Sequence, residues 1–496
     1  MTEFLIAYMA PIIFASMVMF LLVGFPVAFA LAANGVVFGL IGIELGMLGP
    51  QLFQALPDRI FGVMANDTLL AIPFFTFMGL ILERSGMAED LLDTIGQLFG
   101  PVRGGLAFAV IFVGALLAAT TGVVAASVIS MGLISLPIML RYGYDRKLAS
   151  GVIAASGTLA QIIPPSLVLI IMADQLGKSV GDMYAGAFIP GFVLTGLYAG
   201  YVILIAIFKP EWAPALPLEA RTLRGGKLAL RVLTTLVPPL LLIFLVLGTI
   251  FIGVATPTEG GAMGATGALI MAVARKRLSW KLLKQAMETT AKLTTFVVFI
   301  LVGARVFSLT FYGVDGHKWV EHLLSDLPGG QVGFLIAVNI IVFVLAFFLD
   351  FFELSFIIVP LLGPVADKLG IDLIWFGVLL AVNMQTSFMH PPFGFALFYL
   401  RSVAPPTIKT TDIYWGAIPF VCIQIIMIAL VIMFPQMVSA GLDDEVKYDI
   451  DAVKIESSDY GNPSTPSGLE NPQATQAAED AANKAIMDSM KEPEKK

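Results

Sequence analysis

The chain has 496 residues, of which 58% are hydrophobic and only 13% are charged. This composition excludes a water-soluble domain of that size and indicates a membrane protein with many spans. Apolar runs of about 20 residues recur along the sequence, as helices that cross a bilayer require, and no region has the short alternating strands of a membrane barrel. The net charge of -7 comes largely from the C-terminal tail. We therefore predict an all-α polytopic membrane protein.

The predicted elements fall into five consecutive regions. The last of them is acidic, contains Ser, Pro, Ala, Glu and Lys with almost no aromatic residues, and is predicted to be disordered. The regions are N-terminal scaffold helices (1–67), a first repeat (68–208), a cytoplasmic loop with connecting helices (209–293), a second repeat (294–436) and the tail (437–496).

Each repeat contains an apolar segment of unsuitable length for straight spans. Residues 104–140 carry no charge. This apolar stretch is too long for one span and too short for two spans with a loop. A re-entrant helical hairpin fits this length, with its turn at the small polar group Thr120-Thr121-Gly122. Residues 332–366 predict a second hairpin, whose turn carries Asp350 and Glu353.

The two halves also align with each other without gaps. A constant shift of 227 positions superposes two single prolines, one proline pair and one aspartate, which indicates an internal repeat. The aligned positions are Pro101 with Pro328, Pro137 with Pro364, Asp145 with Asp372, and Pro164-Pro165 with Pro391-Pro392.

Charged residues beside the hairpins predict their orientation. Basic residues flank the first hairpin and mainly acidic residues flank the second, so the first opens to the cytoplasm and the second to the outside. The repeats are then inverted, and both termini lie outside. The flanking residues are Arg103, Arg141, Arg146 and Lys147 for the first, and Asp326, Asp367 and Asp372 for the second.

A Pro-Pro pair interrupts an apolar helix in each repeat, in 148–173 and in 373–400. Proline has no N–H to donate to the carbonyl one turn back, so each break frees carbonyl oxygens that suit a dehydrated sodium ion. Such breaks are tolerated only where they line a protein interior or a watery cavity. Inverted repeats with matched breaks are typical of secondary transporters. For one pair alone, the alternative is a kink that shapes packing.

Other polar residues in apolar segments leave two interpretations open. Asp350 and Glu353 are either ion ligands or caps of the hairpin's second helix. His390 either contacts substrate or is structural, and Arg305 either attracts an anionic substrate or pairs with a buried acid such as Glu353. The runs LERSGMAEDLLDTI and ARKRLSWKLLKQAM are predicted to be interfacial helices. No nucleotide-binding loop or paired catalytic motif is present, which argues against an enzyme.

Several stretches together resemble the large membrane subunit of tripartite ATP-independent periplasmic (TRAP) transporters, within the ion-transporter superfamily. They are ATPTEGGAMGATGAL, ISLPIMLRYGYD, LAQIIPPS, DFFELSFIIVPLLGPVADKLGID and QTSFMHPPFGFALFYLRSVAP, and the likeness runs from about Phe20 to Pro435. The resemblance implies sodium-coupled uptake of an organic acid in a bacterial inner membrane, with no nucleic-acid partner. It also implies a periplasmic binding protein, a small four-helix membrane subunit and an elevator motion.

The resemblance places two sodium sites, each made by a hairpin turn and a break. The first contains Thr120, Thr121, Gly122, Gly157 and Thr158, and the second contains Asp350, Glu353, Gln385, Thr386 and Ser387. The other residues of the breaks are assigned to substrate: Gln161, Pro164, Pro165, Asn383, His390, Pro391 and Pro392.

The second hairpin turn, LDFFELS, and the second break, QTSFMHPP, resemble the branch for mannitol, chloroaromatic or keto acids. Two alternatives to a binding-protein-dependent importer are a stand-alone carboxylate transporter of the same superfamily and a membrane enzyme or channel.

Overall fold

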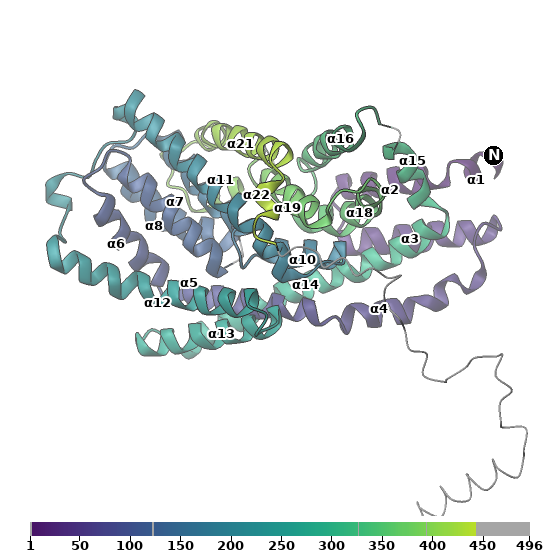
Figure 1. Ribbon diagram of the computed structural model, residues 1–496, viewed down its shortest axis with the longest axis horizontal. Coiled ribbons are helices and arrows are strands. Elements are labelled where there is room, and N and C mark those ends of the chain that lie inside the picture. The colour runs from purple at the N-terminus through teal and green to yellow at the C-terminus, as the bar shows by residue number, and fades with distance from the viewer. Residues whose placement is uncertain (1, 122–123, 326, 393, 443–496) are drawn as a thin grey trace, which may run out of the picture. The chain divides into compact units, whose positions relative to one another are not determined.

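The computed structural model describes residues 2–121, 124–325, 327–392 and 394–442, and within these every regular element is a helix (Figure 1). Six helices are long and apolar enough to cross a membrane, or up to eight if each of two bent helix pairs is one span. The predicted all-α polytopic fold is therefore confirmed. The part of the predicted tail from residue 443 onward lies outside the described residues.

Two helix pairs that pack closely form a framework. Helix α3 (Val27–Glu44) packs on α14 (Trp280–Gly313), and α13 (Pro257–Ala274) packs on α5 (Ala71–Arg84). Glycines permit the approach: a Cβ added to Gly303 would lie 2.4 Å from the Ala28 carbonyl oxygen. Small residues let membrane helices approach until their backbones touch, and van der Waals packing then holds them together.

Both predicted hairpins are present. The first consists of α7 (Gly105–Thr121) and α8 (Val124–Arg141). The second begins with α16 (Gly330–Leu345) and returns through a short helix, a π-helical turn and a final α-helix, all in direct succession. These are α17 (Phe351–Glu353), η6 (Leu354–Ile358) and α18 (Val359–Lys368).

Both predicted helix breaks are present as well, and each Pro-Pro pair lies in the non-helical segment. The Pro164-Pro165 and Pro391-Pro392 peptide bonds are both cis. The first broken helix consists of α9 (Arg146–Thr158), η3 (Leu159–Gln161) and α10 (Leu167–Leu176). The second consists of α19 (Leu373–Met384), η7 (Gln385–Phe388) and α20 (Phe395–Val403).

Positions related by the shift of 227 have the same local roles. Asp145 caps α9 by accepting hydrogen bonds from the amides of Lys147 and Leu148. Its equivalent, Asp372, caps α19 by accepting from the Trp375 amide. A capping carboxylate satisfies amides that the first helical turn leaves unpaired. The internal repeat is thus visible in hydrogen bonds as well as in sequence.

The remaining helices connect and cover these parts. Helix α14 is one helix of 34 residues, so the part of the predicted interfacial run ARKRLSWKLLKQAM from Trp280 onward continues into the membrane span without an interruption. The boundary predicted at residue 293 lies inside this helix, because neither proline nor glycine interrupts it before Gly303. The other long helices are α2 (Met9–Val23), α6 (Met87–Phe99), α11 (Val180–Phe208), α12 (Gly225–Phe251), α15 (Gly316–Ser325) and α21 (Thr410–Met433).

The short elements are α1 (Thr2–Ala7), η1 (Pro50–Ala55), α4 (Leu56–Met64), η2 (Asp67–Leu70), η4 (Pro210–Trp212), η5 (Leu218–Ala220) and α22 (Gln436–Ser439).

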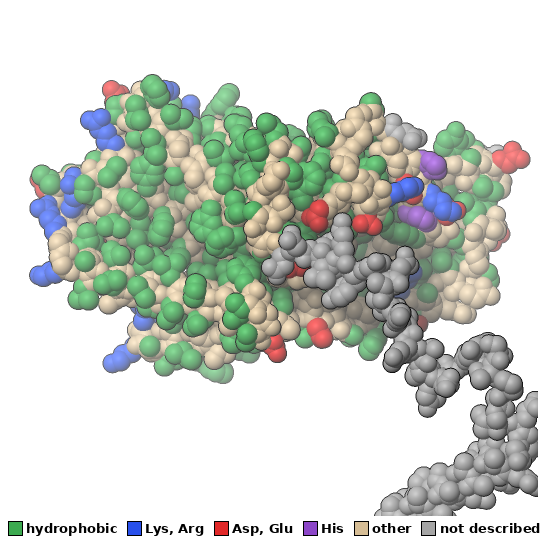
Figure 2. All heavy atoms as spheres, in the orientation of Figure 1, with side chains coloured by type: hydrophobic (Ala, Val, Ile, Leu, Met, Phe, Trp, Pro, Cys, Tyr) green, Lys and Arg blue, Asp and Glu red, His purple; other side chains and the backbone are tan. Residues whose placement is uncertain are grey.

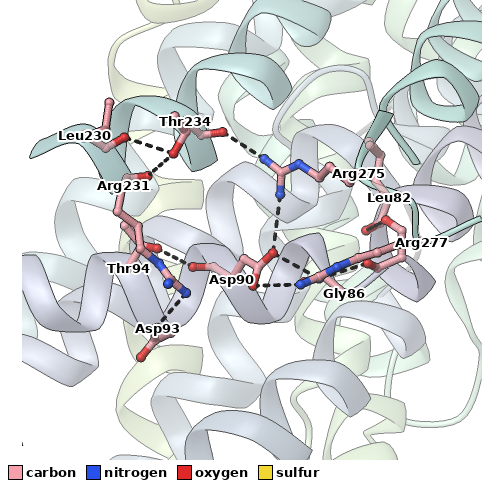
Figure 3. Close-up of polar contacts among 11 residues, drawn as sticks. Leu82, Gly86, Asp90, Asp93, Thr94, Leu230, Arg231, Thr234, Arg275 and Arg277 are labelled. Atoms are coloured by element: carbon pink, nitrogen blue, oxygen red, sulfur yellow. Dashed lines mark hydrogen bonds and ion pairs between the residues drawn. The ribbon is translucent and has the colours of Figure 1, made fainter. Parts of the chain in front are cut away.

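Lys and Arg side chains gather on the left of Figure 2, where Figure 1 shows α6, α8 and α12. Figure 3 shows how some of them are held: Asp90 of α6 lies 3.4 Å from Arg275 and 3.0 Å from Arg277, and Arg231 of α12 lies 3.3 Å from Asp93. These pairs connect α6 to α12 and to the segment after α13. The gathering of basic groups accords with the predicted orientation, which stays a prediction.

Candidate functional site

The two helix breaks contact each other directly. The side-chain Nε2 of Gln385 donates a hydrogen bond of 3.1 Å to the backbone oxygen of Thr158, and both residues are fully buried. The amide of Ile162, which a continuing α-helix would direct to this oxygen, bonds Leu159 instead, so the change from α-helix to the 3-10 turn leaves the Thr158 oxygen able to accept from Gln385 as well. The two residues are 227 positions apart. A residue that touches its own repeat equivalent lies beside the axis that relates the repeats.

A second contact is repeated on the two sides with the residue sizes exchanged. A Cβ added to Gly157 would lie 2.2 Å from Cγ2 of Val128, so the first break and the first hairpin are in close contact. The equivalent residues are Met384 and Ser355, and the Ser355 hydroxyl lies 3.5 Å from the Met384 sulfur. Each hairpin therefore packs on the break of its own repeat through one large and one small residue.

Hydroxyl groups at the breaks donate hydrogen bonds to backbone oxygens three residues earlier in the chain. Thr158 Oγ1 donates to the Ala155 oxygen at 2.8 Å, Thr386 Oγ1 to Asn383 at 2.7 Å, and Ser387 Oγ to Met384 at 2.7 Å. Once a hydroxyl has donated its proton, the lone pairs of its oxygen remain available to a cation.

Three buried amide oxygens at the breaks have no hydrogen-bond partner among the described residues: Gln161 Oε1, Asn383 Oδ1 and Gln385 Oε1. The amide nitrogens of Asn383 and Gln385 are engaged, by Asn339 and by Thr158, and this fixes where the oxygens point. A buried acceptor without a partner costs about 1–3 kcal/mol. Such oxygens require a donor or a cation, and hard cations such as sodium prefer oxygen ligands.

The carboxylates of the second hairpin form a capping box. The Glu353 amide donates to Asp350 Oδ1 at 2.9 Å, and the Asp350 amide donates to Glu353 Oε2 at 2.9 Å. Capping, one of the two interpretations, is therefore confirmed; ion ligation stays a prediction. In the described part of the chain no group of three or more His, Cys, Asp and Glu residues could hold a metal. A cation here would be held mainly by carbonyl, hydroxyl and amide oxygens.

One hollow of about 300 Å³ brings both hairpins and both breaks together, and we call it the central hollow. Six of its thirteen lining residues are aromatic, one is an acid and none is basic. They are Val124 and Ala125 at the start of α8, Gln161, Leu167 and Val168 at the first break, Leu293 and Phe296 of α14, Asp350, Phe351 and Phe352 at the second hairpin, and Phe388, Phe395 and Tyr399 at the second break and α20.

The predicted site residues are distributed unevenly around this hollow. Gln161 and Asp350 line it. The side chains of Asn383, Gln385 and Thr386 are buried at the second break but do not line the central hollow. Gly122 lies outside the described residues, as do the side chains of Thr120 and Thr121. The prolines of both pairs shape the breaks and do not line the hollow: Pro164, Pro165, Pro391 and Pro392.

The ring of His390 is held by aromatic packing. It stacks on Phe347 with ring centroids 4.1 Å apart and meets Phe343 edge-on at 4.4 Å. Only 1% of the residue is exposed, and it does not line the central hollow. The ring packing fits the structural interpretation, whereas both ring nitrogens are buried without a hydrogen-bond partner in the described chain, so both interpretations stay open and contact with substrate stays a prediction.

Sequence reasoning missed most of the lining. Phe296 and Tyr399 lie in apolar helices, where an aromatic residue looks like any other membrane-facing or core residue. Asn339, which orients Asn383, also lies in an apolar run of α16. A buried asparagine in such a run was the one local signal that would have identified it.

Residues 14–437 match the family described as tripartite ATP-independent periplasmic transporter, DctM component. The C4-dicarboxylate TRAP transporter large permease protein DctM of Pseudomonas aeruginosa is 29% identical over 78% of this chain and 89% of its own length. The ectoine TRAP transporter large permease protein TeaC of Halomonas elongata is 26% identical over 86% of this chain and 98% of its own length. The sialic acid TRAP transporter permease protein SiaT of Haemophilus influenzae is 26% identical over 78% of this chain and 62% of its own length.

Among solved structures, the YdaH transporter of Alcanivorax borkumensis superposes with a TM-score of 0.53 at 16% identity, over 77% of this chain and 88% of that one. This likeness supports the helical fold.

Proposed function

Because the chain belongs to the family of the DctM component of tripartite ATP-independent periplasmic transporters, we propose that it is the large membrane subunit of a sodium-coupled importer. Its substrate is an organic acid delivered by a periplasmic binding protein. The observation that carries the proposal is the central hollow, where both hairpins and both broken helices meet. In secondary transporters built from inverted repeats, substrate and coupling ions bind at such a meeting point. The relatives are named as transporter permeases and not as enzymes.

Sodium coupling is supported by the oxygens of the breaks. Gln161, Asn383 and Gln385 each present a buried amide oxygen without a partner in the described chain, and Thr158 and Thr386 add hydroxyl oxygens. Sodium ions bound at the two breaks would stabilise the region where Gln385 of one repeat already contacts Thr158 of the other. The gain in stability from ion binding would favour the arrangement of breaks and hairpins that holds substrate.

The substrate class follows from the family and from the hollow. Relatives are named for C4-dicarboxylates, sialic acid and ectoine, so the family leaves the molecule open. A volume of about 300 Å³ fits a small organic acid. The first amides of α8, which begins at Val124, and the amide of Gln161 are the donors at the hollow that suit a carboxylate.

The same membership supports the remaining parts of the proposal. The chain works in a bacterial inner membrane with a small four-helix subunit, and both termini lie in the periplasm. The hairpins and broken helices slide as one body past the framework of α3, α5, α13 and α14. The direct backbone contact at Gly303 suits a fixed framework. On the side that faces the second hairpin, by contrast, α14 lines the central hollow and a second hollow.

Reconstitution into proteoliposomes tests the proposal. Uptake of labelled organic acids is measured for the chain alone, with the small subunit, and with the small subunit and the cognate binding protein. We expect uptake only when all three are present and sodium is higher outside. Uptake by the chain alone would replace the tripartite assignment by a stand-alone carrier.

A further inference from the structure

A second hollow, of about 290 Å³, lies beside the central one between α14, the end of α10 and the second hairpin. We call it the arginine hollow. Its lining comes from α4, α10 and α14 and from the η6–α18 part of the hairpin, elements that lie next to one another in Figure 1. The lining residues are Arg59, Gln175, Leu301, Ala304, Arg305, Ser308, Tyr312, Phe356 and Pro360.

The charges of the two hollows are opposite. Two guanidinium groups and no carboxylate line the arginine hollow, whereas Asp350 and no basic residue line the central hollow. Neither Arg59 nor Arg305 makes an ion pair with any acid that the structure describes, and the pairing of Arg305 with Glu353 considered from the sequence is not formed. Both arginines are exposed. Their charge is therefore available to an anion that enters.

The central hollow and the arginine hollow are both lined by α14 and by the second hairpin. Phe296 and Arg305 are nine residues apart on α14, which is about 14 Å along a helix. On the hairpin, Phe352 lines the central hollow and Phe356 the arginine hollow. Aromatic rings stand between the hollows, with centroids 5.6 Å apart for Phe296 and Phe352 and 6.3 Å for Phe352 and Phe356. Rotamer changes of these rings would widen the passage between the two hollows.

A third hollow continues from the arginine hollow toward the end of the second hairpin. It measures about 510 Å³ and shares Gln175, Arg305, Tyr312 and Pro360 with the arginine hollow. Its other end is lined by Asp367 and Leu373, beside the loop that the charge pattern predicts to lie outside. The three hollows thus lie in order from the predicted outer face to the central hollow.

We propose that Arg59 and Arg305 bind the carboxylate of the incoming substrate in the arginine hollow, as an entry station before the central hollow. The inference rests on the proposed function for the identity of the anion. Arginine binds carboxylates in a planar, bidentate geometry and carries its charge at every physiological pH. Arginines at the ends of spans are often merely hydrated. Here two of them, from α4 and α14, converge on one hollow together with Ser308 and with Gln175, whose amide donates to Asp174 of the adjoining third hollow.

The charge of the hollow can be tested without a known substrate. Cys422 is the only cysteine and is exposed, so it is first replaced by serine. In that background Ser308→Cys places a thiol in the arginine hollow, and Ser439→Cys places a control thiol on exposed α22. The rates of modification by an anionic and a cationic methanethiosulfonate reagent of similar size are then compared.

We expect the anionic-to-cationic rate ratio to be about tenfold higher at position 308 than at position 439. Arg59→Gln combined with Arg305→Gln should abolish the difference, and succinate or benzoate should slow the anionic reagent at position 308 only. Equal ratios at the two positions would overturn the proposal. If Ser308→Cys does not give a monodisperse protein, Ala304→Cys provides the thiol, because Ala304 lines the same hollow.

Uptake kinetics supply the second arm. Arg305→Gln should raise KM for the transported acid about tenfold and leave the maximal rate within about twofold, whereas Arg224→Gln, an exposed arginine on the predicted inner side, should change neither. If the unmodified assembly transports the acid and Arg305→Gln leaves its KM unchanged, the entry station is overturned. Absence of uptake by the unmodified assembly would instead refute the proposed function, and the thiol result would still decide the charge of the hollow.

Discussion

Gly157 is a position where one added methyl group would disturb the packing between the first hairpin and the first break. The Cβ of Gly157→Ala would lie 2.2 Å from Val128 Cγ2, 3.3 Å from the Val128 amide nitrogen and 3.4 Å from its Cα. Valine is stiff at χ1, so its side chain cannot simply turn away. Relief requires the hairpin to move off the break. Overpacking of this kind costs about 1–3 kcal/mol.

A matched control separates this effect from that of removing a glycine. Gly196 lies within α11, and no heavy atom lies within 4 Å of a Cβ added there. We expect Gly196→Ala to be neutral or to stabilise by up to about 1 kcal/mol, because alanine favours helix more than glycine does.

The double variant Gly157→Ala/Val128→Ala tests the assigned contact itself. Once Val128 Cγ2 is removed, the closest remaining atoms are the amide nitrogen and Cα of residue 128, at 3.3 and 3.4 Å from the Cβ of residue 157. Small shifts relieve distances of this size. We expect a coupling free energy of about 0.5–3 kcal/mol between the two sites, in the direction of rescue.

The assay for the unmodified chain, Gly157→Ala, Val128→Ala, their double variant and Gly196→Ala is thermal unfolding in detergent, followed by the loss of the monodisperse chromatography peak. Gly157→Ala should melt below the unmodified chain, and Val128→Ala should restore part of the loss. The reasoning would be refuted if Gly157→Ala melted like Gly196→Ala, or if the second substitution brought no recovery.

Three further predictions concern the breaks and the second hairpin. Asp350→Asn should preserve stability, because asparagine caps a helix as well as aspartate, and should weaken sodium activation of uptake; Asp350→Ala should also lose about 1 kcal/mol of stability. Full sodium activation in Asp350→Asn would leave that carboxylate with its capping role alone. Thr158→Ala or Thr386→Ala should weaken sodium activation more than expression, and normal activation in both would remove these hydroxyls from the ion sites. Gln385→Leu should lower stability by about 1 kcal/mol in the same melting assay, because the Thr158 carbonyl loses this buried hydrogen bond; an unchanged melting temperature would contradict the contact.

The hairpins and breaks were predictable because their signals are local. A charge-free run of the wrong length predicts a hairpin, and a Pro-Pro pair inside an apolar run predicts a break, whatever the rest of the chain does. The repeat was predictable because Asp145 and Asp372 cap equivalent helices and so recur at a fixed shift. The same shift predicts that some equivalent residues meet at the axis, but not which pair does so.

The linings of the hollows could not be predicted, because they depend on contacts between distant segments. Phe296, Phe352 and Phe395 meet in one hollow although each lies in an apolar run where phenylalanine is ordinary. The capping box of Asp350 and Glu353 was one of two interpretations that the sequence left open, since a buried acid serves equally as cap or ligand. The arginine hollow combines α4 with α14, and no local pattern joins Arg59 to Arg305.

The most direct test of the account is the flux of radiolabelled sodium into proteoliposomes that contain this chain with its small subunit and binding protein. With saturating substrate on the outside, we predict sodium entry that requires substrate and is reduced in Thr158→Ala/Thr386→Ala. Substrate uptake that proceeds at the same rate without sodium, and without any accompanying sodium entry, would contradict the assignment of the broken helices as the coupling site.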